Sequence, residues 1–365
     1  MLKDLAKRAL GLGSKPSRLF TDFASDQEFV EALYRVILNR KSDPSGLAHH
    51  VERLGKGEVA RHELLRDFIR SEECRHNCAV KYEPHEVLLD YQPVLDPAPF
   101  APHVRDKPLE GAQLCELVNP RKWLDQGWYD TLKDMQALSL RLDDIHRKHY
   151  EYVQTAYGLR LLGALHPGAS VLGVGAGHER ILYWLANNAA RVVGTDLYEG
   201  NWASDNAQEG DPDVIENPAK YAPFPYRQEA LSFQRMDGRK LEFDGHSFDV
   251  VYSLSSIEHF GGHEGSAQSM AEIGRVLKKG GVAAIATELI LNDASDDEFF
   301  SLADLVKYVV APSGLKLVQM PVLELPRAVL ERPLNLPQER YYRPHLVLSE
   351  RGLVYTSVML FLVKE

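Results

Sequence analysis

The chain has 365 residues, of which 44% are hydrophobic and 26% are charged, and its formal net charge is −10 at pH 7. This length predicts about two domains, and this composition is typical of an ordinary soluble globular protein. The acidic balance argues against a nucleic-acid-binding protein, because no strongly basic region stands out that would neutralise phosphates.

The cysteines are few and odd in number: Cys74, Cys78 and Cys115. Such a set indicates a reducing compartment, so we expect a cytoplasmic protein without a disulfide framework. The spacing Cys74-x-His76-x-Cys78 lacks a second pair of ligands, so we interpret it as an ordinary helix end and predict no metal site. The sequence shows no secretory signal, and no apolar run approaches the roughly 20 residues that cross a bilayer.

Residues 1–20 form an N-terminal segment. Within residues 1–13, Leu2, Leu5 and Leu10 share one helical face and basic side chains lie elsewhere. A basic amphipathic helix is compatible with weak contact to a membrane surface. One short helix is marginally stable alone, so a frayed or packed terminus is the favoured interpretation.

Residues 21–82 predict a small bundle of three helices. Ser25 and Glu28 form a capping box before the first helix, and Asp43-Pro44 begins the second. The segments FVEALYRVILNRKSDPSGL and ELLRDFIRSEE resemble a bacterial helical family of unassigned function, DUF4214, over about residues 21–75. The resemblance implies a domain found beside glycan-related glycosyltransferases and methyltransferases. It implies no chemistry, and we expect this domain to bind a protein or glycan partner.

Residues 83–120 are rich in proline: Pro84, Pro93, Pro97, Pro99, Pro102, Pro108 and Pro120. Proline removes a backbone donor and stops helices, so we expect a semi-rigid linker draped over a surface. The boundary placed here leaves residues 121–365 as a second domain.

The second domain is organised around residues 169–196. A short apolar strand runs into a glycine turn, a helix follows, and a second strand ends at Asp196. This order is typical of a nucleotide-binding α/β unit, in which ligands bind at the carboxyl ends of the strands. We expect Asp196 to accept hydrogen bonds from ribose hydroxyls. A dinucleotide fingerprint is excluded, because its third glycine would fall at His178 or Arg180.

The run Gly173-x-Gly175-x-Gly177 resembles the first motif of the class I S-adenosylmethionine (SAM)-dependent methyltransferases. Three further segments resemble later motifs in the same order: the strand ending in Asp237-Gly238, FDVVYSLSSIEHF and EIGRVLKKGGV. The resemblance covers about residues 141–291. It implies an α/β fold, a Rossmann-like sheet of seven strands closed by an antiparallel hairpin, preceded here by the small α-helical domain.

The same resemblance implies SAM as the cofactor. The residues that it assigns to cofactor binding are Gly173, Gly175, Gly177, Asp196, Leu197, Asp237, Gly238 and Ser253. Most members have an acid where this chain has Gly173, and glycine where it has Glu179. A compensating role for Glu179 or Glu258 stays open.

His259 is the candidate catalytic base, because the ordinary imidazole pKa of about 6.5 suits proton uptake near neutrality. Glu258 is the second catalytic candidate, and His263 and Asp293 are weaker ones. In the family an E-H pair after the fourth strand frequently only shapes the pocket, so both interpretations stay open.

The resemblances together predict a methyltransferase for the oxygen of a bacterial surface glycan or of its precursor. Residues 197–234 are unusually polar, which is typical of an acceptor-binding loop and equally of an insertion without function. Two alternatives remain: a SAM-binding scaffold or regulatory protein that has lost catalysis, and a methyltransferase for a small metabolite.

Overall fold

The computed structural model of the chain describes residues 23–38, 40–71, 73, 84–138, 140, 144–199, 210–339 and 343–365. The predicted N-terminal helix with its membrane contact, and the Cys74-x-His76-x-Cys78 spacing, lie outside these residues. Within the described ranges, no helix is both long enough and apolar enough to cross a bilayer.

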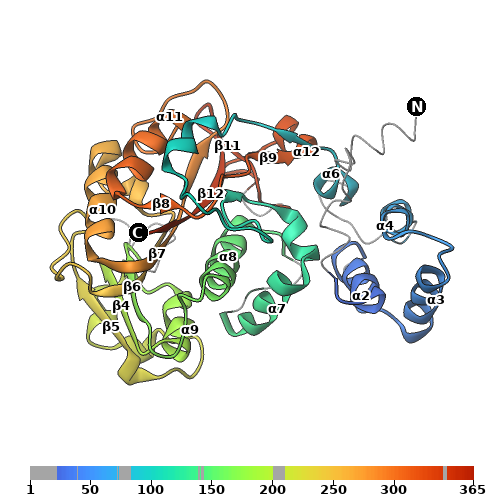
Figure 1. The fold of residues 1–365 in the computed structure, drawn as a ribbon, viewed down its shortest axis with the longest axis horizontal. Coiled ribbons are helices and arrows are strands. Elements are labelled where there is room, and N and C mark those ends of the chain that lie inside the picture. The colour runs from blue at the N-terminus through green and yellow to red at the C-terminus, as the bar shows by residue number, and fades with distance from the viewer. Residues whose placement is uncertain are drawn as a thin grey trace.

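Three helices form the N-terminal bundle: α2 (Asp26–Val36), α3 (Pro44–Gly55) and α4 (Arg61–Arg70). Ser25 and Asp43 cap α2 and α3, because their side chains accept hydrogen bonds from the backbone N–H groups of Glu28 and Gly46. The bundle buries Leu33 and other apolar side chains between its helices. Figure 1 shows the bundle at one end of the molecule, beside α7 (Gln126–Asp134).

The C-terminal part is built on one ten-stranded sheet. Its main path runs β10 (Leu334–Asn335), β11 (Leu348–Glu350), β12 (Leu353–Val363), β7 (Leu277–Ile290), β6 (Phe248–Leu254), β3 (Ser170–Val174), β4 (Arg191–Asp196) and β5 (Leu231–Arg235). The five central strands β7, β6, β3, β4 and β5 are parallel, and their carboxyl ends therefore meet at one edge.

The predicted closing hairpin is present, since β12 pairs antiparallel with both β7 and β8 (Lys316–Leu317). β2 (Glu116–Leu117), β10 and β11 are additional to the predicted seven strands. A separate two-stranded sheet joins β1 (Tyr91–Pro93) to β9 (Glu324–Pro326). The α/β architecture agrees with the one expected from the motifs.

Helices cover both faces of the sheet. α8 (Arg147–Leu161) packs against β6, β7 and β12, whereas α9 (Arg180–Asn188) packs against β4 and β5. α10 (Gly262–Val276) packs on β7, and Figure 1 shows it on the side of the strands opposite α8. The short helices are α6 (Pro84–Leu88), η2 (Ala98–His103), η3 (Pro120–Leu124), η4 (Gln136–Leu138), η7 (Pro212–Ile215), η8 (Pro218–Lys220), η9 (Gln228–Ala230), η10 (Ile257–His259), α11 (Leu302–Asp304), η11 (Leu305–Val310), η12 (Ala311–Ser313) and α12 (Arg327–Glu331).

The proline-rich stretch is part of the C-terminal unit and not a linker draped over it. β1 and β2 lie within it and pair with β9 and β12, and Leu114 and Leu117 are buried in the core. Pro120, for example, lies in the first turn of η3, where no backbone donor is needed. These contacts support a C-terminal domain that begins near residue 84, ahead of the boundary expected at 121.

The described part of the polar stretch after β4 is fixed to α9. Tyr183 donates its hydroxyl hydrogen bond to the carbonyl of Pro218 (3.0 Å), and Arg227 donates to the carbonyl of Ala189 (3.2 Å). Residues 200–209, with Trp202, Asp205 and Asn206, lie outside the described residues. The described part of this insertion is therefore held in place beside the edge of the sheet.

Candidate functional site

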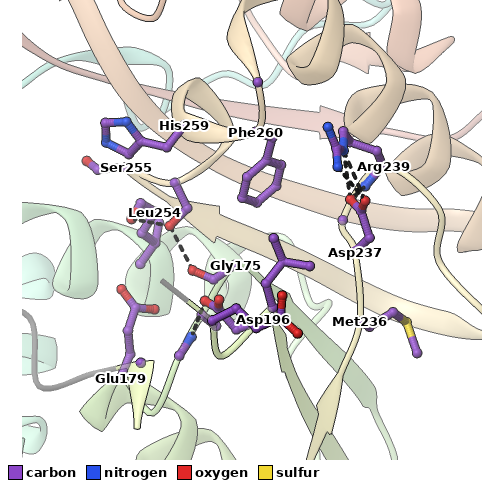
Figure 2. Close-up of a pocket in the computed structure, with 18 of the residues that line it drawn as sticks. Gly175, Glu179, Asp196, Met236, Asp237, Arg239, Leu254, Ser255, His259 and Phe260 are labelled. Carbon is purple, nitrogen blue, oxygen red and sulfur yellow. Dashed lines mark hydrogen bonds and ion pairs between the residues drawn. The ribbon is translucent and has the colours of Figure 1, made fainter. Parts of the chain in front are cut away.

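A cavity of about 400 Å³ lies at the carboxyl ends of the parallel strands, a volume in the range of small-molecule sites. Four connections line it (Figure 2): the glycine turn after β3, and the residues that follow β4, β5 and β6. Its lining includes Gly175, Gly177, Asp196, Leu197, Asp237, Gly238 and His259 from the residues predicted for cofactor binding and catalysis.

The turn after β3 is held by Asp196. The backbone of Gly175 and Gly177 has positive φ (64° and 44°), which glycine adopts without strain. Asp196 Oδ2 accepts a hydrogen bond from the Gly177 N–H at 3.0 Å, and the Ala176 N–H donates to the carbonyl of Thr195. A carboxylate has about four acceptor positions, so Asp196 keeps capacity for a ligand on the cavity side.

Gly173 and Ser253 lie outside the lining of the cavity. A Cβ at Gly173 would approach the Tyr252 hydroxyl oxygen to 2.9 Å, so this glycine makes room for a neighbouring ring. The Ser253 hydroxyl is buried and donates to the carbonyl of Val174 at 2.8 Å. Ser253 therefore stabilises the end of β3 just before the glycine turn, and Gly173 leaves space there for the ring of Tyr252.

Phe260 forms an aromatic wall that the sequence patterns did not indicate. A Cβ at Gly175 would lie 2.5 Å from its Cζ atom, and a Cβ at Gly238 would lie 2.7 Å from its Cε2 atom. Figure 2 shows the ring reaching into the cavity between Gly175 and Asp237. The ring therefore requires glycine at both positions, on two different walls.

Asp237 is paired with a neighbour two residues on. Arg239 donates to both of its carboxylate oxygens, at 2.9 Å to Oδ1 and 2.7 Å to Oδ2. These hydrogen bonds hold the pKa of Asp237 below its ordinary value, so that it stays ionised. The pair is at the rim of the cavity beside Gly238 (Figure 2).

One part of the lining carries two opposite charges, Lys148 from α8 and Glu179 at the start of α9. Lys148 Nζ donates to Glu151 Oε2 at 2.9 Å and to the carbonyl of Leu254 at 3.3 Å. Burial lowers the pKa of Lys148, but the negative charges of Glu151 and, more weakly, of Glu288 and then Glu179 outweigh it and raise the pKa. No sequence pattern indicated that Lys148 would line the cavity, because only the fold brings α8 to this edge of the sheet.

Glu258 does not line the cavity. It is fully buried and accepts a hydrogen bond from Thr287 Oγ1 at 2.8 Å. Burial, followed by the neighbouring Glu288, raises the pKa of Glu258 well above its usual range. Burial also acts to raise the pKa of Glu288, but Arg147, 2.6 Å away, outweighs it and lowers that pKa. Burial therefore favours the neutral form of the Glu258 carboxyl, and this residue is not part of the cavity lining.

His259 lines the cavity, and its Nδ1 lies 3.0 Å from Glu298 Oε2. His263 is placed elsewhere: its Nε2 lies 3.0 Å from the carbonyl oxygen of Phe299, and its ring stacks on Phe300. Asp293 is exposed and does not line the cavity. Of the residues named as candidate bases, His259 is the one at the cavity.

The described residues contain no group of three or more His, Cys, Asp or Glu side chains that could hold a metal ion. The polar side chains of the lining belong to Lys148, Glu179, Asp196, Glu199, Asp237, Arg239, Ser255, Ser256 and His259.

Comparison with known proteins gives two family matches. Residues 172–285 match the family described as a methyltransferase domain, and residues 17–78 match the domain of unknown function DUF4214. No curated protein matches the chain.

Several solved structures resemble the chain at low identity. The 1,6-didemethyltoxoflavin-N1-methyltransferase of Burkholderia thailandensis, with bound 1,6-didemethyltoxoflavin and S-adenosylhomocysteine, is 17% identical, with 57% of this chain and 76% of that one covered and a TM-score of 0.36. A TehB-like SAM-dependent methyltransferase from Corynebacterium glutamicum is 17% identical (65% and 98% covered, TM-score 0.35). A SAM-dependent methyltransferase from Mesorhizobium loti is 15% identical (57% and 96% covered, TM-score 0.36).

Proposed function

We propose that the chain is a SAM-dependent methyltransferase that methylates a hydroxyl oxygen of a bacterial surface glycan or of its precursor, because residues 172–285 match a methyltransferase domain and residues 17–78 match DUF4214. The observation that carries this proposal is the cavity itself. It brings a glycine turn, the Asp196 carboxylate and the His259 imidazole to one edge of the sheet.

The nucleoside half of SAM fits the side of the cavity formed after β4 and β5. Asp196 would accept hydrogen bonds from the ribose hydroxyls, because its carboxylate faces the cavity while holding Gly177. Leu197 is 44% exposed and offers an apolar surface to the adenine. Asp237, kept ionised by Arg239, would accept from the adenine amine.

The amino-acid half of SAM fits the part of the lining with opposite charges. Lys148 would pair with its carboxylate and Glu179 with its ammonium group, which assigns to Glu179 the role that most relatives give to an acid at position 173. An acid cannot take that role at Gly173, because Tyr252 and Ala176 occupy the space beside its Cα.

SAM supplies a methyl group on a positively charged sulfur, so the donor is already activated, and the protein contributes alignment and a base. His259 would take the proton of the acceptor hydroxyl as its oxygen is methylated. The wall formed by Phe260 and the glycine turn would limit water at the reacting groups.

The DUF4214 domain supports a glycan acceptor, because this domain is found beside glycan-related glycosyltransferases and methyltransferases. The test is transfer of labelled methyl from SAM to bacterial lipid-linked glycans, neutral oligosaccharides and small metabolites, followed by linkage analysis. The proposal predicts a methyl ether on a sugar hydroxyl. Label on small metabolites alone would support the alternative acceptor class, and label on nitrogen would contradict O-methylation.

A further inference from the structure

We propose that Glu298 is a positioning residue for His259, which it holds in the tautomer that can accept a proton from the acceptor. This inference rests on the proposed role of His259 as the base. Glu298 lies outside the methyltransferase motifs, on the connection between β7 and α11, and is brought to His259 only by the fold.

The contact determines which ring nitrogen carries the proton. Glu298 Oε2 lies 3.0 Å from Nδ1 of His259. An ionised carboxylate can only accept hydrogen bonds, so Nδ1 must be the donor. In a neutral imidazole the other nitrogen then has the lone pair, so Nε2 becomes the basic atom. In water a histidine side chain prefers the opposite tautomer, with the proton on Nε2. Glu298 therefore selects the less common form.

The carboxylate is presented from a segment whose backbone is fixed on both sides. Asp296 Oδ1 accepts hydrogen bonds from the backbone N–H groups of Glu298 (2.9 Å) and Phe299 (3.0 Å). Phe300, next in the chain, is fully buried and bridges to Leu289 of β7. These contacts set the position of Glu298 relative to η10, on which His259 lies.

The ion pair between Glu298 and His259 contributes little to the stability of the folded protein. The Glu298 side chain is 51% exposed and that of His259 is 26% exposed, and exposed ion pairs add little to folding. The pair does fix the orientation of the His259 ring, and this matters because a base acts only when its lone pair faces the proton that it takes. The negative charge of Glu298 would also stabilise the imidazolium that forms.

The test begins with the histidine tautomer in the full-length protein. Long-range proton–nitrogen correlation spectra of ¹⁵N-histidine-labelled protein distinguish the two tautomers, and His259→Gln identifies the His259 signals. Wild type is expected to show a protonated Nδ1 and an unprotonated Nε2. Glu298→Ala should move the proton to Nε2. Glu298→Gln keeps an acceptor oxygen without the charge, and should retain the wild-type tautomer. Asp297→Ala, a neighbouring exposed acid, is the control for net charge.

Kinetics with the acceptor found in the glycan screen completes the test. Glu298→Ala should lower kcat by about tenfold or more, less than the roughly 10² to 10⁴ that loss of a general base costs, with KM for SAM unchanged. Glu298→Gln should fall between Glu298→Ala and wild type. A wild-type Nε2–H tautomer, or a tautomer in Glu298→Ala identical to wild type, would overturn the positioning role. So would an unchanged kcat in Glu298→Ala. If wild type methylates no glycan, the proposed function fails while the tautomer spectra still decide the role of Glu298.

Discussion

Replacing Glu179 by glutamine tests the proposed amino-acid end of the cofactor site. The substitution keeps the size and polarity of a buried side chain and removes its charge. Lys148 retains its partner Glu151 at 2.9 Å, so the other charge of this part of the cavity is not left unpaired. We therefore expect the loss of the contact with the ligand ammonium group to appear in the affinity for ligands that carry this group.

The size of the effect follows from the strength of hydrogen bonds to charged groups. Such a bond contributes about 1.5 to 3 kcal/mol, which corresponds to an affinity loss of about 10-fold to 150-fold. We expect this loss for S-adenosylhomocysteine, which carries the amino-acid group. We expect no comparable loss for 5′-methylthioadenosine, which has the same nucleoside and no amino-acid group.

Isothermal titration calorimetry with the two ligands separates these outcomes. Asp196→Asn is the matched control, because its residue faces the nucleoside side and the variant should weaken both ligands. Equal losses for both ligands in Glu179→Gln would show that the substitution deforms the cavity. Wild-type affinity for S-adenosylhomocysteine in Glu179→Gln would refute the assignment of Glu179 outright.

Three further predictions concern the cavity and its supports. Gly175→Ala should lower the melting temperature and weaken S-adenosylhomocysteine binding, because φ is 64° and the new Cβ would meet Phe260. Thermal unfolding checks it, and Phe260→Leu in the same chain should recover part of the loss; no shift in melting temperature would contradict the steric argument. His259→Gln should reduce methyl transfer by about 10² to 10⁴ while ligand affinity by calorimetry stays at the wild-type value; a rate close to wild type would remove the base role. Glu258→Gln should flatten the pH dependence of stability. In wild type, Glu258 stays protonated in the folded state while the unfolded carboxyl loses its proton near pH 4.3, so stability falls as pH rises from there towards the raised folded pKa. The lowered pKa of Glu288 acts in the other direction and below that range, where stability falls as pH falls. Urea unfolding of both proteins between about pH 5 and 8 measures the difference, and parallel pH profiles would contradict it.

Local patterns in the sequence were enough to predict the strand ends and turns that line the candidate site. The strand that ends at Asp196, the glycine turn, and the Asp237-Gly238 pair are each encoded by residues close together in the chain, and all three reach the cavity. The parallel strands made this outcome predictable, because their carboxyl ends share one edge.

Residues that depend on distant packing could not be found in this way. Lys148 reaches the cavity because α8 packs on β6, and Glu298 reaches His259 because β7 ends next to η10. Gly173 and Ser253 fit the motif by position, yet neighbouring side chains turn them into supports behind the cavity. The proline-rich stretch looked like a linker by composition, but its pairing with β9 and β12 depends on residues more than 200 positions away.

The most direct measurement is the affinity of S-adenosylhomocysteine for wild type and for Asp196→Asn, each at a protein concentration that resolves weak binding. Asparagine still offers an oxygen to the Gly177 N–H, so the turn is expected to persist. We predict clear binding to wild type and an affinity about tenfold or more lower in the variant. Absence of binding to wild type, or equal affinity in both proteins, would contradict a cofactor site built on Asp196.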